Sequence, residues 1–497
     1  MTPLDGPLPR AVQVSARGWG WRHAGRRAFA ARHLDLELTP GERVLLLGAS
    51  GAGKSTVLHA LAGVLGSNDE GEQEGDLLLD GVPPAAARGR AGLVLQDPES
   101  QVVLARVGDE VAFAAENLAV PRDEIWRRVH RALDDVGLDL PLDHPTTALS
   151  GGQKQRLALA SVLAMEPGLL LLDEPTANLD PDGVLEVRDA VIRVLDRTRA
   201  TLVVVEHRVA VWADVVDRVI VLDADGGVLA DGAPGEVLVQ EATSSRLEQA
   251  GVWVPGRRPA VGGAVPTSDG GEVLLAATGL DVARTKRGPV AVAGLDLAVR
   301  AGQAIGITGP NGAGKSTAAL TLGGLLRPRA GSVRAAPALA GTAGDDPFRW
   351  RSPELVQRIG TVFQEPEHQF LTASVGEELA FGPARVGGAQ APGRIAEIAE
   401  RLRLTHLLKA NPFTLSGGEK RRLSVATMLA TTPRILVLDE PTFGQDALTW
   451  AELVTLLREL VHDGVAVLSV THDAEFIDAL GGATLHVSGG AGTLVHR

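Results

Sequence analysis

The sequence contains no cysteine among its 497 residues and no run of roughly eighteen or more uncharged apolar residues. The missing cysteines exclude disulfides, thiolate metal sites and cysteine nucleophiles, and they suit a reducing cytoplasm. Because a membrane-spanning helix needs about 20 apolar residues, we expect none here. The N-terminus, MTPLDGPLPRAV, has no basic segment followed by an apolar one, so we also expect no signal peptide.

Positive charge is also in short supply. Lys and Arg number 48 against 61 Asp and Glu, which gives a formal net charge of −13. This balance argues against broad electrostatic binding to nucleic acid. The length and the 45% hydrophobic content predict a globular chain with at least two domains.

Five short segments of the first half return in the second half, in the same order and at nearly constant spacing. Such a pattern indicates a duplicated domain and not a solenoid, whose repeats are far shorter. The repeated pairs are GASGAGKST (48–56) with GPNGAGKST (309–317), QDPESQ (96–101) with QEPEHQ (364–369), LSGGQKQR (149–156) with LSGGEKRR (415–422), LLLLDEPT (169–176) with ILVLDEPT (435–442), and apolar strands ending in His207 and His472.

Between the repeats, residues 256–271 are rich in Gly and Pro and lack the periodicity of a helix or strand. We therefore predict a first domain over residues 11–250, a linker over 251–271 and a second domain over 272–497. Within each repeat, short apolar runs alternate with helical patterns, which predicts an α/β fold with a mainly parallel sheet covered on both faces.

Both repeats contain the pattern G-x-x-x-x-G-K-[ST] between a strand and a helix, which indicates a phosphate-binding loop. The glycines let successive backbone N–H groups face an anion, and the helix adds the positive end of its dipole. The lysines would reach the β- and γ-phosphates of ATP. The predicted ATP-binding residues are Gly48, Ala49, Ser50, Gly51, Ala52, Gly53, Lys54, Ser55, Thr56, Gly309, Pro310, Asn311, Gly312, Ala313, Gly314, Lys315, Ser316 and Thr317.

An Asp-Glu pair follows a buried strand in each repeat, and a histidine ends the next strand. Beside a phosphate-binding loop, the aspartate and the loop serine suit Mg²⁺, while the glutamate can polarise the attacking water and the histidine can sense the γ-phosphate. The predicted metal ligands are Ser55, Asp173, Ser316 and Asp439, and the predicted catalytic residues are Glu174, Glu440, His207 and His472.

The pattern L-S-G-G-[QE] is foreign to a generic phosphate-binding loop protein, and with it both repeats resemble the nucleotide-binding domains of ABC transporters. The resemblance covers nearly all of the chain outside the linker. It implies two P-loop NTPase domains in tandem, each with a mainly parallel core sheet, a helical signature subdomain and a small antiparallel β portion. The two catalytic sets are complete, so two competent ATPase sites are expected.

The resemblance further implies that each ATP lies between the phosphate-binding loop of one domain and the signature of the other. ATP would then close the pair, and hydrolysis would release it. The signature residues implied to bind ATP are Ser150, Gly151, Gly152, Gln153, Ser416, Gly417, Gly418 and Glu419. The D-loop residues are Asp180 and Asp446, and the glutamines implied to touch Mg²⁺ and the attacking water are Gln96 and Gln364.

The two ATP sites are expected to differ in affinity. The family usually stacks adenine on an aromatic residue before the first strand of the core; Trp21 fits this place, with Trp19 as the alternative, whereas residues 280–290 contain no aromatic residue. Because stacking contributes about 1–2 kcal/mol, ATP should bind more weakly at the Lys315 site than at the Lys54 site. ATP affinities measured in variants of each single P-loop lysine check this, and equal affinities would contradict it.

Among ABC ATPases, the phrase Q-x-P-[DE]-x-Q resembles the energy-coupling factor (ECF) group, which imports vitamins and metal ions. The chain then resembles the group's fused ATPase subunit, which works with a transmembrane coupling protein and a small membrane protein that binds the substrate. The residues implied to contact the transmembrane partner are Pro98, Glu99, Gln101, Pro366, Glu367 and Gln369. A polar surface turn nucleated by the prolines is the plain alternative reading of this phrase.

Two other functions remain open on the sequence alone. The fused ATPase of a sugar or peptide importer has a similar length, although one half of it often carries a degenerate catalytic set. Soluble ribosome-acting tandem ATPases favour a long charged helical linker, which this short neutral one does not resemble.

Overall fold

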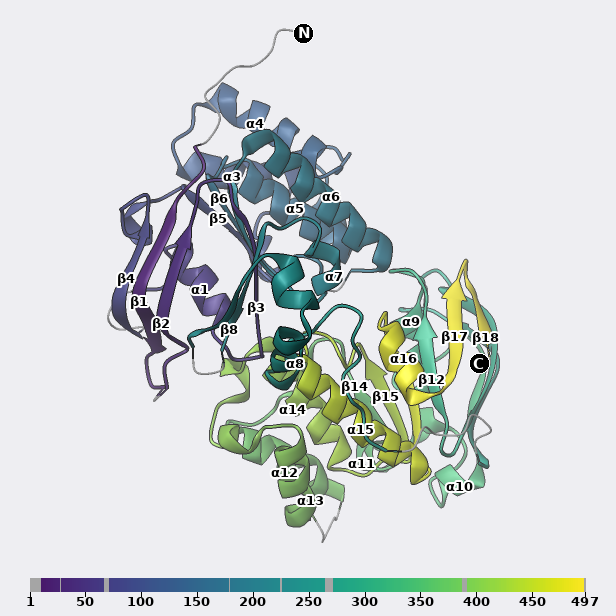
Figure 1. Cartoon of the computed structure of the whole chain (residues 1–497). Coiled ribbons are helices and arrows are strands. Elements are labelled where there is room, and N and C mark those ends of the chain that lie inside the picture. The colour runs from purple at the N-terminus through teal and green to yellow at the C-terminus, as the bar shows by residue number, and fades with distance from the viewer. Residues whose placement is uncertain are drawn as a thin grey trace. The chain divides into compact units, whose positions relative to one another are not determined.

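The structure is a computed structural model that describes residues 10–26, 28–66, 71–177, 179–223, 226–263, 271–386 and 391–495. The chain divides into two compact units, Met1–Arg257 with Asp446–Leu448, and Arg258–Gln445 with Thr449–Arg497 (Figure 1). None of the described helices combines the length and the hydropathy that a membrane crossing requires.

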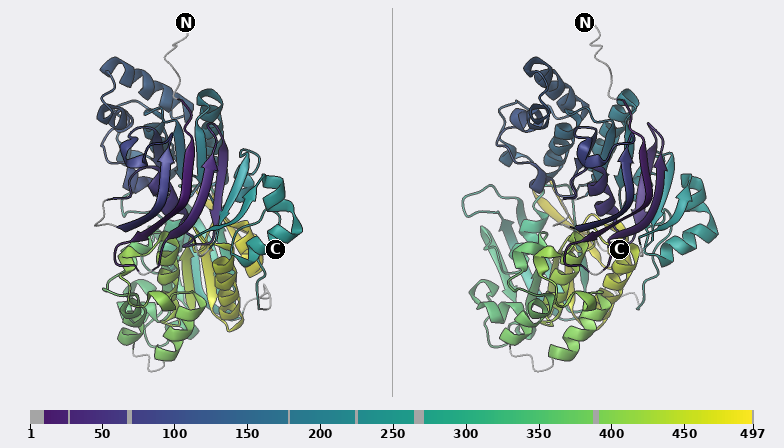
Figure 2. Two further views of the ribbon diagram at one scale, coloured as in Figure 1. Left: turned by 60° about the vertical axis from the view of Figure 1, so that its left-hand side comes forward. Right: turned by 90° about the vertical axis from the view of Figure 1, so that its left-hand side faces the viewer.

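A six-stranded sheet in the order β5-β6-β7-β3-β8-β9 forms the centre of the first unit, and every neighbouring pair is parallel except β8–β9. A separate three-stranded antiparallel sheet has the order β2-β1-β4 (Figure 2). The strands are β1 (Val14–His23), β2 (Ala31–Leu38), β3 (Arg43–Gly48), β4 (Gly71–Leu79), β5 (Ala91–Val94), β6 (Leu169–Asp173), β7 (Thr201–Val205), β8 (Arg218–Leu222) and β9 (Val228–Gly232).

The helices of the first unit follow the predicted alternation. Among them, α3, α4 and α5 pack on one another and form the helical subdomain. They are α1 (Lys54–Leu61), η1 (Pro84–Ala86), α2 (Pro98–Gln101), α3 (Val107–Asn117), α4 (Arg122–Asp135), η2 (Thr146–Ala148), α5 (Gly151–Leu163), α6 (Pro181–Thr198), α7 (Val209–Trp212), η3 (Gly235–Val239) and α8 (Glu241–Gln249).

The second unit repeats both sheets. Its six-stranded sheet has the order β14-β15-β16-β12-β17-β18, with only β17–β18 antiparallel, and its three-stranded sheet has the order β11-β10-β13. The strands are β10 (Val273–Val282), β11 (Val292–Arg300), β12 (Ala304–Thr308), β13 (Ala330–Ala335), β14 (Ile359–Val362), β15 (Ile435–Asp439), β16 (Ala466–Val470), β17 (Ala483–Ser488) and β18 (Ala491–Val495).

Helices α12, α13 and α14 form the helical subdomain of the second unit. The helices are α9 (Lys315–Leu322), α10 (Pro337–Ala340), η4 (Pro347–Arg349), α11 (Ser352–Val356), η5 (Pro366–Gln369), α12 (Val375–Val386), α13 (Ala391–Arg401), η6 (Thr405–Leu407), η7 (Pro412–Thr414), α14 (Gly417–Leu429), α15 (Ala447–His462) and α16 (Ala474–Leu480). The predicted fold class, two α/β P-loop domains in tandem, is confirmed.

Apolar strands explain this architecture. Strands β6, β7, β15 and β16 are buried along their whole length, as expected of central parallel strands covered by helices on both faces. Their carboxyl ends meet at one edge of each sheet, next to the loop that follows β3 or β12. The fold therefore brings the phosphate-binding loop, the Asp-Glu pair and the histidine of each repeat to one place.

The proposed linker has structure on both sides of its centre. Val252 and Val254 are buried in the core of the first unit. Gly262 donates a backbone hydrogen bond to Thr455 Oγ1 at 3.0 Å, within the second unit. Residues 264–270 lie outside the described part of the chain, so the boundaries at 250 and 272 stay a prediction.

Candidate active site

The phosphate-binding loop of the first unit connects β3 to α1. Gly48 has φ = 152°, and a Cβ there would lie 3.0 Å from the carbonyl oxygen of Leu222, so the loop requires glycine. Lys54 is buried at the first position of α1, and its Nζ donates to the carbonyl oxygens of Gly48 at 2.8 Å and Ala49 at 3.0 Å. The loop therefore curls around its own lysine, with the N-terminus of α1 directly behind it.

The loop of the second unit repeats this geometry between β12 and α9. Lys315 is buried, and its Nζ donates to the carbonyl oxygens of Gly309 at 2.8 Å and Pro310 at 3.0 Å. Gly309 has φ = 139°, and a Cβ there would meet the carbonyl oxygen of Val487 at 1.9 Å. In both loops a buried lysine and the N-terminus of the following helix lie together, an arrangement that suits an anion.

Asp173 and Asp439 lie at the ends of β6 and β15 and are almost fully buried. Each accepts a hydrogen bond from the serine that follows the P-loop lysine, Ser55 or Ser316. Burial, followed by the charge of Glu174, raises the pKa of Asp173 to about 6, and burial likewise raises the pKa of Asp439. The fold therefore disfavours the ionised form of both carboxylates.

These residues fit a magnesium ion. Asp439 Oδ1 is buried and has no hydrogen-bond partner among the described residues, and serine and aspartate oxygens are the donors that Mg²⁺ prefers. Among the described residues, no group of three or more His, Asp or Glu side chains could hold a metal ion by itself. Phosphate oxygens of ATP commonly supply further Mg²⁺ ligands at sites of this kind.

Glu174 is held from two sides. Its Oε2 accepts a hydrogen bond from Gln96 Nε2 at 2.8 Å, and its Oε1 lies 3.1 Å from His207 Nε2. Burial alone would raise the pKa of Glu174, but His207, Lys54 and the hydrogen bond from Gln96 outweigh it and hold that pKa below its ordinary value. The structure thus brings together three predicted site residues around an ionised carboxylate.

Glu440 has the same backbone but different surroundings. Both glutamates have φ = 48°, an uncommon value for a residue with a side chain, and Glu440 N donates to Val470 O at 2.8 Å. His472 Nε2 lies 3.9 Å from Glu440 Oε1 and 3.2 Å from Asn311 Oδ1. Gln364 is exposed, and no hydrogen bond among the described residues joins it to Glu440. Burial, then the charge of Asp439, raises the pKa of Glu440 to about 7.

A buried cation that the sequence did not single out accompanies this difference. Arg421 on α14 donates to the carbonyl oxygens of Phe363 at 3.1 Å and Asp439 at 3.2 Å, and it lies beside Glu440. The equivalent residue of α5 is Gln155, which is buried and whose side-chain amide has no partner among the described residues. The substitution is visible in the sequences LSGGQKQR and LSGGEKRR. The structure shows in addition that both side chains are buried and that the arginine lies beside Glu440.

The signature residues open α5 and α14. Ser150 Oγ accepts from Gln153 N at 3.3 Å, while Gln153 Oε1 accepts from Ser150 N at 2.9 Å, which is a capping box. Ser416 and Glu419 form the same box, with Glu419 Oε2 accepting from Ser416 N at 2.8 Å. Glutamine and glutamate are therefore interchangeable here, because each uses one oxygen for the cap.

Trp21, expected to stack on adenine, needs a correction. Its ring is 4% exposed within the core around the three-stranded sheet, and a Cβ on Gly71 would lie 2.3 Å from it, so the indole is covered. The alternative, Trp19, is also buried. His23, at the end of β1, is exposed instead, and its Nε2 lies 3.3 Å from Thr56 Oγ1 at the start of α1. Its ring therefore lies beside the start of α1, which follows the phosphate-binding loop.

The residues expected to contact a membrane partner are largely occupied within their own units. Gln101 Oε1 accepts from Leu95 N at 2.9 Å and Gln101 Nε2 donates to Leu93 O at 3.2 Å, so its amide braces its own loop. Gln369 repeats this with Phe363 N and Thr361 O. The acidic residues form ion pairs with a lysine of the signature helix, as the pairs Glu99–Lys154 and Glu367–Lys420. Pro98 and Pro366 begin α2 and η5.

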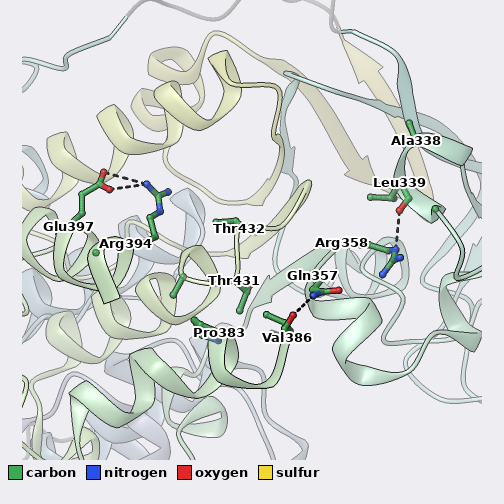
Figure 3. Close-up of a pocket in the computed structure, with 13 residues that line it drawn as sticks. Ala338, Leu339, Gln357, Arg358, Pro383, Val386, Arg394, Glu397, Thr431 and Thr432 are labelled. Carbon is green, nitrogen blue, oxygen red and sulfur yellow. Dashed lines mark hydrogen bonds and ion pairs between the residues drawn. The ribbon is translucent and has the colours of Figure 1, made fainter. Parts of the chain in front are cut away.

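A hollow of about 940 Å³ lies elsewhere in the second unit, between α10, α11, α12 and α13 (Figure 3). Arg358 Nε donates to Leu339 O at 3.0 Å, and Gln357 Nε2 donates to Val386 O at 2.7 Å across its wall. These contacts hold the helices of the unit to one another. None of the P-loop, signature or Asp-Glu residues lines the hollow, so it is separate from the candidate active site.

Comparison with known proteins agrees with this geometry. The sequence profile of the family described as ABC transporter matches residues 31–177 and 292–443. YkoD of Bacillus subtilis (strain 168), provisionally named an HMP/thiamine import ATP-binding protein, is 36% identical over 482 residues, or 91% of this chain and 85% of that protein. A Caldanaerobacter subterraneus protein, provisionally named an ABC transporter ATP-binding protein, is 31% identical over 486 residues, or 89% of this chain and 84% of that protein.

Among solved structures, an archaeal ribosome recycling factor, determined in complex with a ribosomal stalk protein, gives a TM-score of 0.61 at 20% identity. The match covers 97% of this chain and 89% of that one. At this identity the likeness concerns the fold alone. The profile matches, in contrast, contain both phosphate-binding loops, both signatures and both Asp-Glu pairs. The chain therefore belongs to the ABC transporter family and is an ATPase with two ATP-binding domains in tandem.

Proposed function

We propose that the chain is the ATP-hydrolysing subunit of an ECF-type importer at the cytoplasmic face of the cell membrane. It would drive a transmembrane coupling protein that works with a small substrate-binding membrane protein, and the imported solute would be a vitamin, a vitamin precursor or a metal ion. The two Q-x-P-E-x-Q loops support this assignment. The name of YkoD, which refers to HMP/thiamine import, supports it as well.

In the proposed reaction, the two domains close on two ATP molecules, each held by a phosphate-binding loop and a signature. Glu174 and Glu440 would accept a proton from the attacking water, and His207 and His472 would orient the γ-phosphate end of the site. Bound Mg²⁺, held by Ser55, Asp173, Ser316, Asp439 and the glutamines Gln96 and Gln364, would neutralise phosphate charge. Asp180 and Asp446 would face the partner domain as D-loop residues.

The observation that carries the importer proposal is an exposed apolar residue at the end of each glutamine loop, whose backbone N–H is hydrogen-bonded to a buried glutamate. Val103 is 66% exposed and Leu371 is 67% exposed, at equivalent places in the two units. Glu110 Oε2 accepts from Val103 N at 3.0 Å, and Glu378 Oε2 accepts from Leu371 N at 2.9 Å. Both glutamates are buried near the start of the next helix and tie the loop to it.

An aromatic residue follows on the next helix of each unit, but only the first one is exposed. Phe113 follows Glu110 by one turn of α3 and is 43% exposed, whereas Phe381, which follows Glu378 in the same way on α12, is half-buried with the guanidinium of Arg385 4.2 Å from the centre of its ring. Exposed apolar side chains on a braced backbone suit docking of an amphipathic helix. We assign this surface to a cytoplasmic helix of the transmembrane coupling protein. It replaces Gln101 and Gln369, whose amides serve the loop, as the proposed point of contact.

Val103→Glu and Leu371→Glu should each weaken co-purification with the membrane partner, and the double variant should abolish it. A buried contact of this kind contributes about 1.5–3 kcal/mol per side chain, and a carboxylate in its place must also be desolvated. Pull-down in mild detergent, with identification of the captured membrane proteins, is the measurement. ATP-induced thermal stabilisation of each variant shows whether its fold is retained.

Val239→Glu is the matched control, because Val239 is 75% exposed and lies in η3, outside the glutamine loops. It should co-purify as the wild type does. Full retention of the membrane partner by the Val103→Glu, Leu371→Glu double variant would overturn the docking surface. Capture of ribosomes in place of membrane proteins, in the presence of ATP and Glu174→Gln, would overturn the importer proposal itself.

A further inference from the structure

In both units a carboxylate binds the threonine that ends the sequence D-E-P-T. In the first unit this carboxylate belongs to the residue before the histidine, and in the second unit to the residue after it. Thr176 and Thr442 are both buried. The residue before His207 is Glu206, and it binds Thr176; the residue after His472 is Asp473, and it binds Thr442. The sequences V-E-H-R and V-T-H-D therefore bind the same threonine through carboxylates at different positions.

Glu206 gathers four donors in the first unit and is 4% exposed. Its Oε1 accepts from Thr176 N at 3.0 Å and also from Thr176 Oγ1. Its Oε2 accepts from His207 N at 3.1 Å and from Arg208 N at 3.3 Å. One carboxylate thereby joins the turn that follows Glu174 to the backbone that carries His207.

Arg208, whose backbone N–H donates to Glu206, extends this connection with its side chain. Its side chain reaches across so that NH1 donates to the carbonyl oxygen of Leu179 at 3.5 Å. Leu179 directly precedes Asp180, whose side chain caps α6 by accepting from Gly183 N at 3.0 Å. The chain from His207 to the D-loop thus runs through Glu206, Thr176 and Arg208 without leaving the first unit.

The second unit divides the same work between two side chains. Thr471 Oγ1 accepts from Asp473 N at 3.0 Å, where Glu206 accepts from Arg208 N in the first unit. Asp473 Oδ2 accepts from Thr442 Oγ1 at 3.0 Å and from Trp450 Nε1 at 2.8 Å on α15. Its Oδ1 accepts from Phe476 N at 2.9 Å and caps α16. Position 473 is therefore fully used as an anchor to α15 and α16.

We propose that Glu206 and Arg208 are positioning residues that couple the switch histidine His207 to the D-loop at Leu179 and Asp180. Neither residue touches the reacting atoms. Glu206 joins the end of β7 to the turn after Glu174, so that the two segments move together. Arg208 links this pair of segments to the D-loop through its contact with Leu179. The inference rests on the roles proposed above for Glu174 and His207, and it makes the first site mechanically distinct from the second.

The test uses the full chain in a Glu440→Gln background, where remaining ATP hydrolysis comes from the first site. Glu206→Gln replaces an acceptor by an amide that cannot receive all four donors. We expect kcat to fall roughly tenfold or more while the Kd for ATP changes less than about twofold. Arg208→Ala, at an exposed position, should lower kcat several-fold with the same unchanged Kd.

The decisive measurement is a rescue. The double variant Glu206→Thr, Arg208→Asp rebuilds the V-T-H-D arrangement of the second unit and lacks the arginine, so its turnover should rise from that of Glu206→Thr to about that of Arg208→Ala. A purely structural role for Glu206 would instead lower the melting temperature and the ATP affinity of Glu206→Gln together with kcat. Normal turnover in Glu206→Gln, or a double variant no faster than Glu206→Thr, would overturn the proposal; unchanged turnover in Arg208→Ala would overturn its D-loop part.

One further variant separates this inference from the catalytic roles on which it rests. Glu174→Gln in the same background should remove the remaining hydrolysis. If hydrolysis persists there, the proposed base is wrong and the coupling loses its foundation. If hydrolysis is lost there but Glu206→Gln remains fully active, only the coupling is wrong. Should Glu206→Gln fail to fold, Arg208→Ala and the rescue variant still decide the question.

Discussion

The double variant Glu174→Gln, Glu440→Gln is expected to bind ATP normally and to hydrolyse it roughly 10²-fold or more slowly, the usual effect of losing a general base. Both glutamates occupy the same backbone position with φ = 48°, at the end of a buried strand and behind a P-loop lysine. Glutamine keeps the size and polarity of the side chain but cannot accept the proton of the attacking water. In the proposed site, binding of ATP rests on the phosphate-binding loop and its lysine, which remain in this variant.

The single variants should differ, because the two carboxylates differ. Glu174 is ionised and aligned by Gln96 and His207, whereas the pKa of Glu440 is raised to about 7 by burial and by Asp439. Before ATP and its metal arrive, a good fraction of Glu440 is therefore protonated near neutral pH. We expect Glu174→Gln to remove more than half of the ATPase activity near pH 7, and the contribution of the second site to grow as the pH rises.

Steady-state ATPase assays and nucleotide-binding measurements on purified protein check these expectations. Glu116→Gln is a suitable control, because Glu116 is an exposed residue at the end of α3. In the assembled transporter, Glu440→Gln should also slow uptake strongly. Normal uptake by that variant would argue against two productive sites, and a loss of ATP binding in the double variant would show that the glutamates hold the loop.

The parts of the site that the sequence predicted well are those set by short, local patterns. The apolar run RVLLLG (43–48) predicts a strand and the helical spacing over 184–197 predicts a helix, and the structure has β3 and α6 (Pro181–Thr198) there. The pattern over 54–65 predicts a helix of that length, but α1 ends earlier, at Leu61, because Gly63 follows with φ = 70° and stops it. The residues after the signature predict a helix from Gln155, but it begins at Gly151 because Ser150 caps it.

The parts that the sequence could not predict depend on which atoms a side chain meets across the fold. Trp21 has the right chemistry for stacking, but the path of β4 covers it with Gly71. Gln101 lies in a repeated polar phrase, yet its amide turns back onto Leu93 and Leu95. Repetition marked these residues as important without distinguishing contact with a partner from support of a loop.

Glu206 shows the same limit most clearly. Alignment of the repeats on their histidines sets Glu206 against Thr471 and Arg208 against Asp473, two pairs that look like free variation at a strand end. The structure shows that Glu206 binds Thr176 and that Asp473 binds the equivalent Thr442. Both units therefore keep a carboxylate for this threonine, although it stands at a different place in the sequence. Equivalent function at inequivalent positions is invisible to a comparison of motifs.

Opposite effects on stability are expected for the two glutamine variants when nucleotide and metal are absent. The pKa of Glu440 is raised from 4.5 to about 7 on folding, so the folded protein keeps a proton that the unfolded chain releases. The stability linked to this proton is complete below about pH 4.5 and is lost as the pH rises through about 7. Glu440→Gln avoids this loss.

The free energy of unfolding of Glu440→Gln, relative to wild type, should therefore rise by about 3 kcal/mol between about pH 5 and about pH 8, since one pKa unit corresponds to roughly 1.4 kcal/mol. Glu174 behaves in reverse, because its pKa is lowered on folding, chiefly by His207 against the effect of burial. Its ionised form stabilises the protein above about pH 4.5 and loses that effect as the pH falls.

Glu174→Gln should accordingly be least favourable at high pH, where Glu440→Gln is most favourable. Denaturant unfolding in EDTA at several pH values, followed for both variants and the wild type, measures the two slopes directly. Slopes of the same sign would mean that His207 and Gln96 do not hold Glu174 ionised in the free protein. The asymmetry between the two sites would then have to arise only when ATP binds, and not from the environments that the fold builds around each carboxylate.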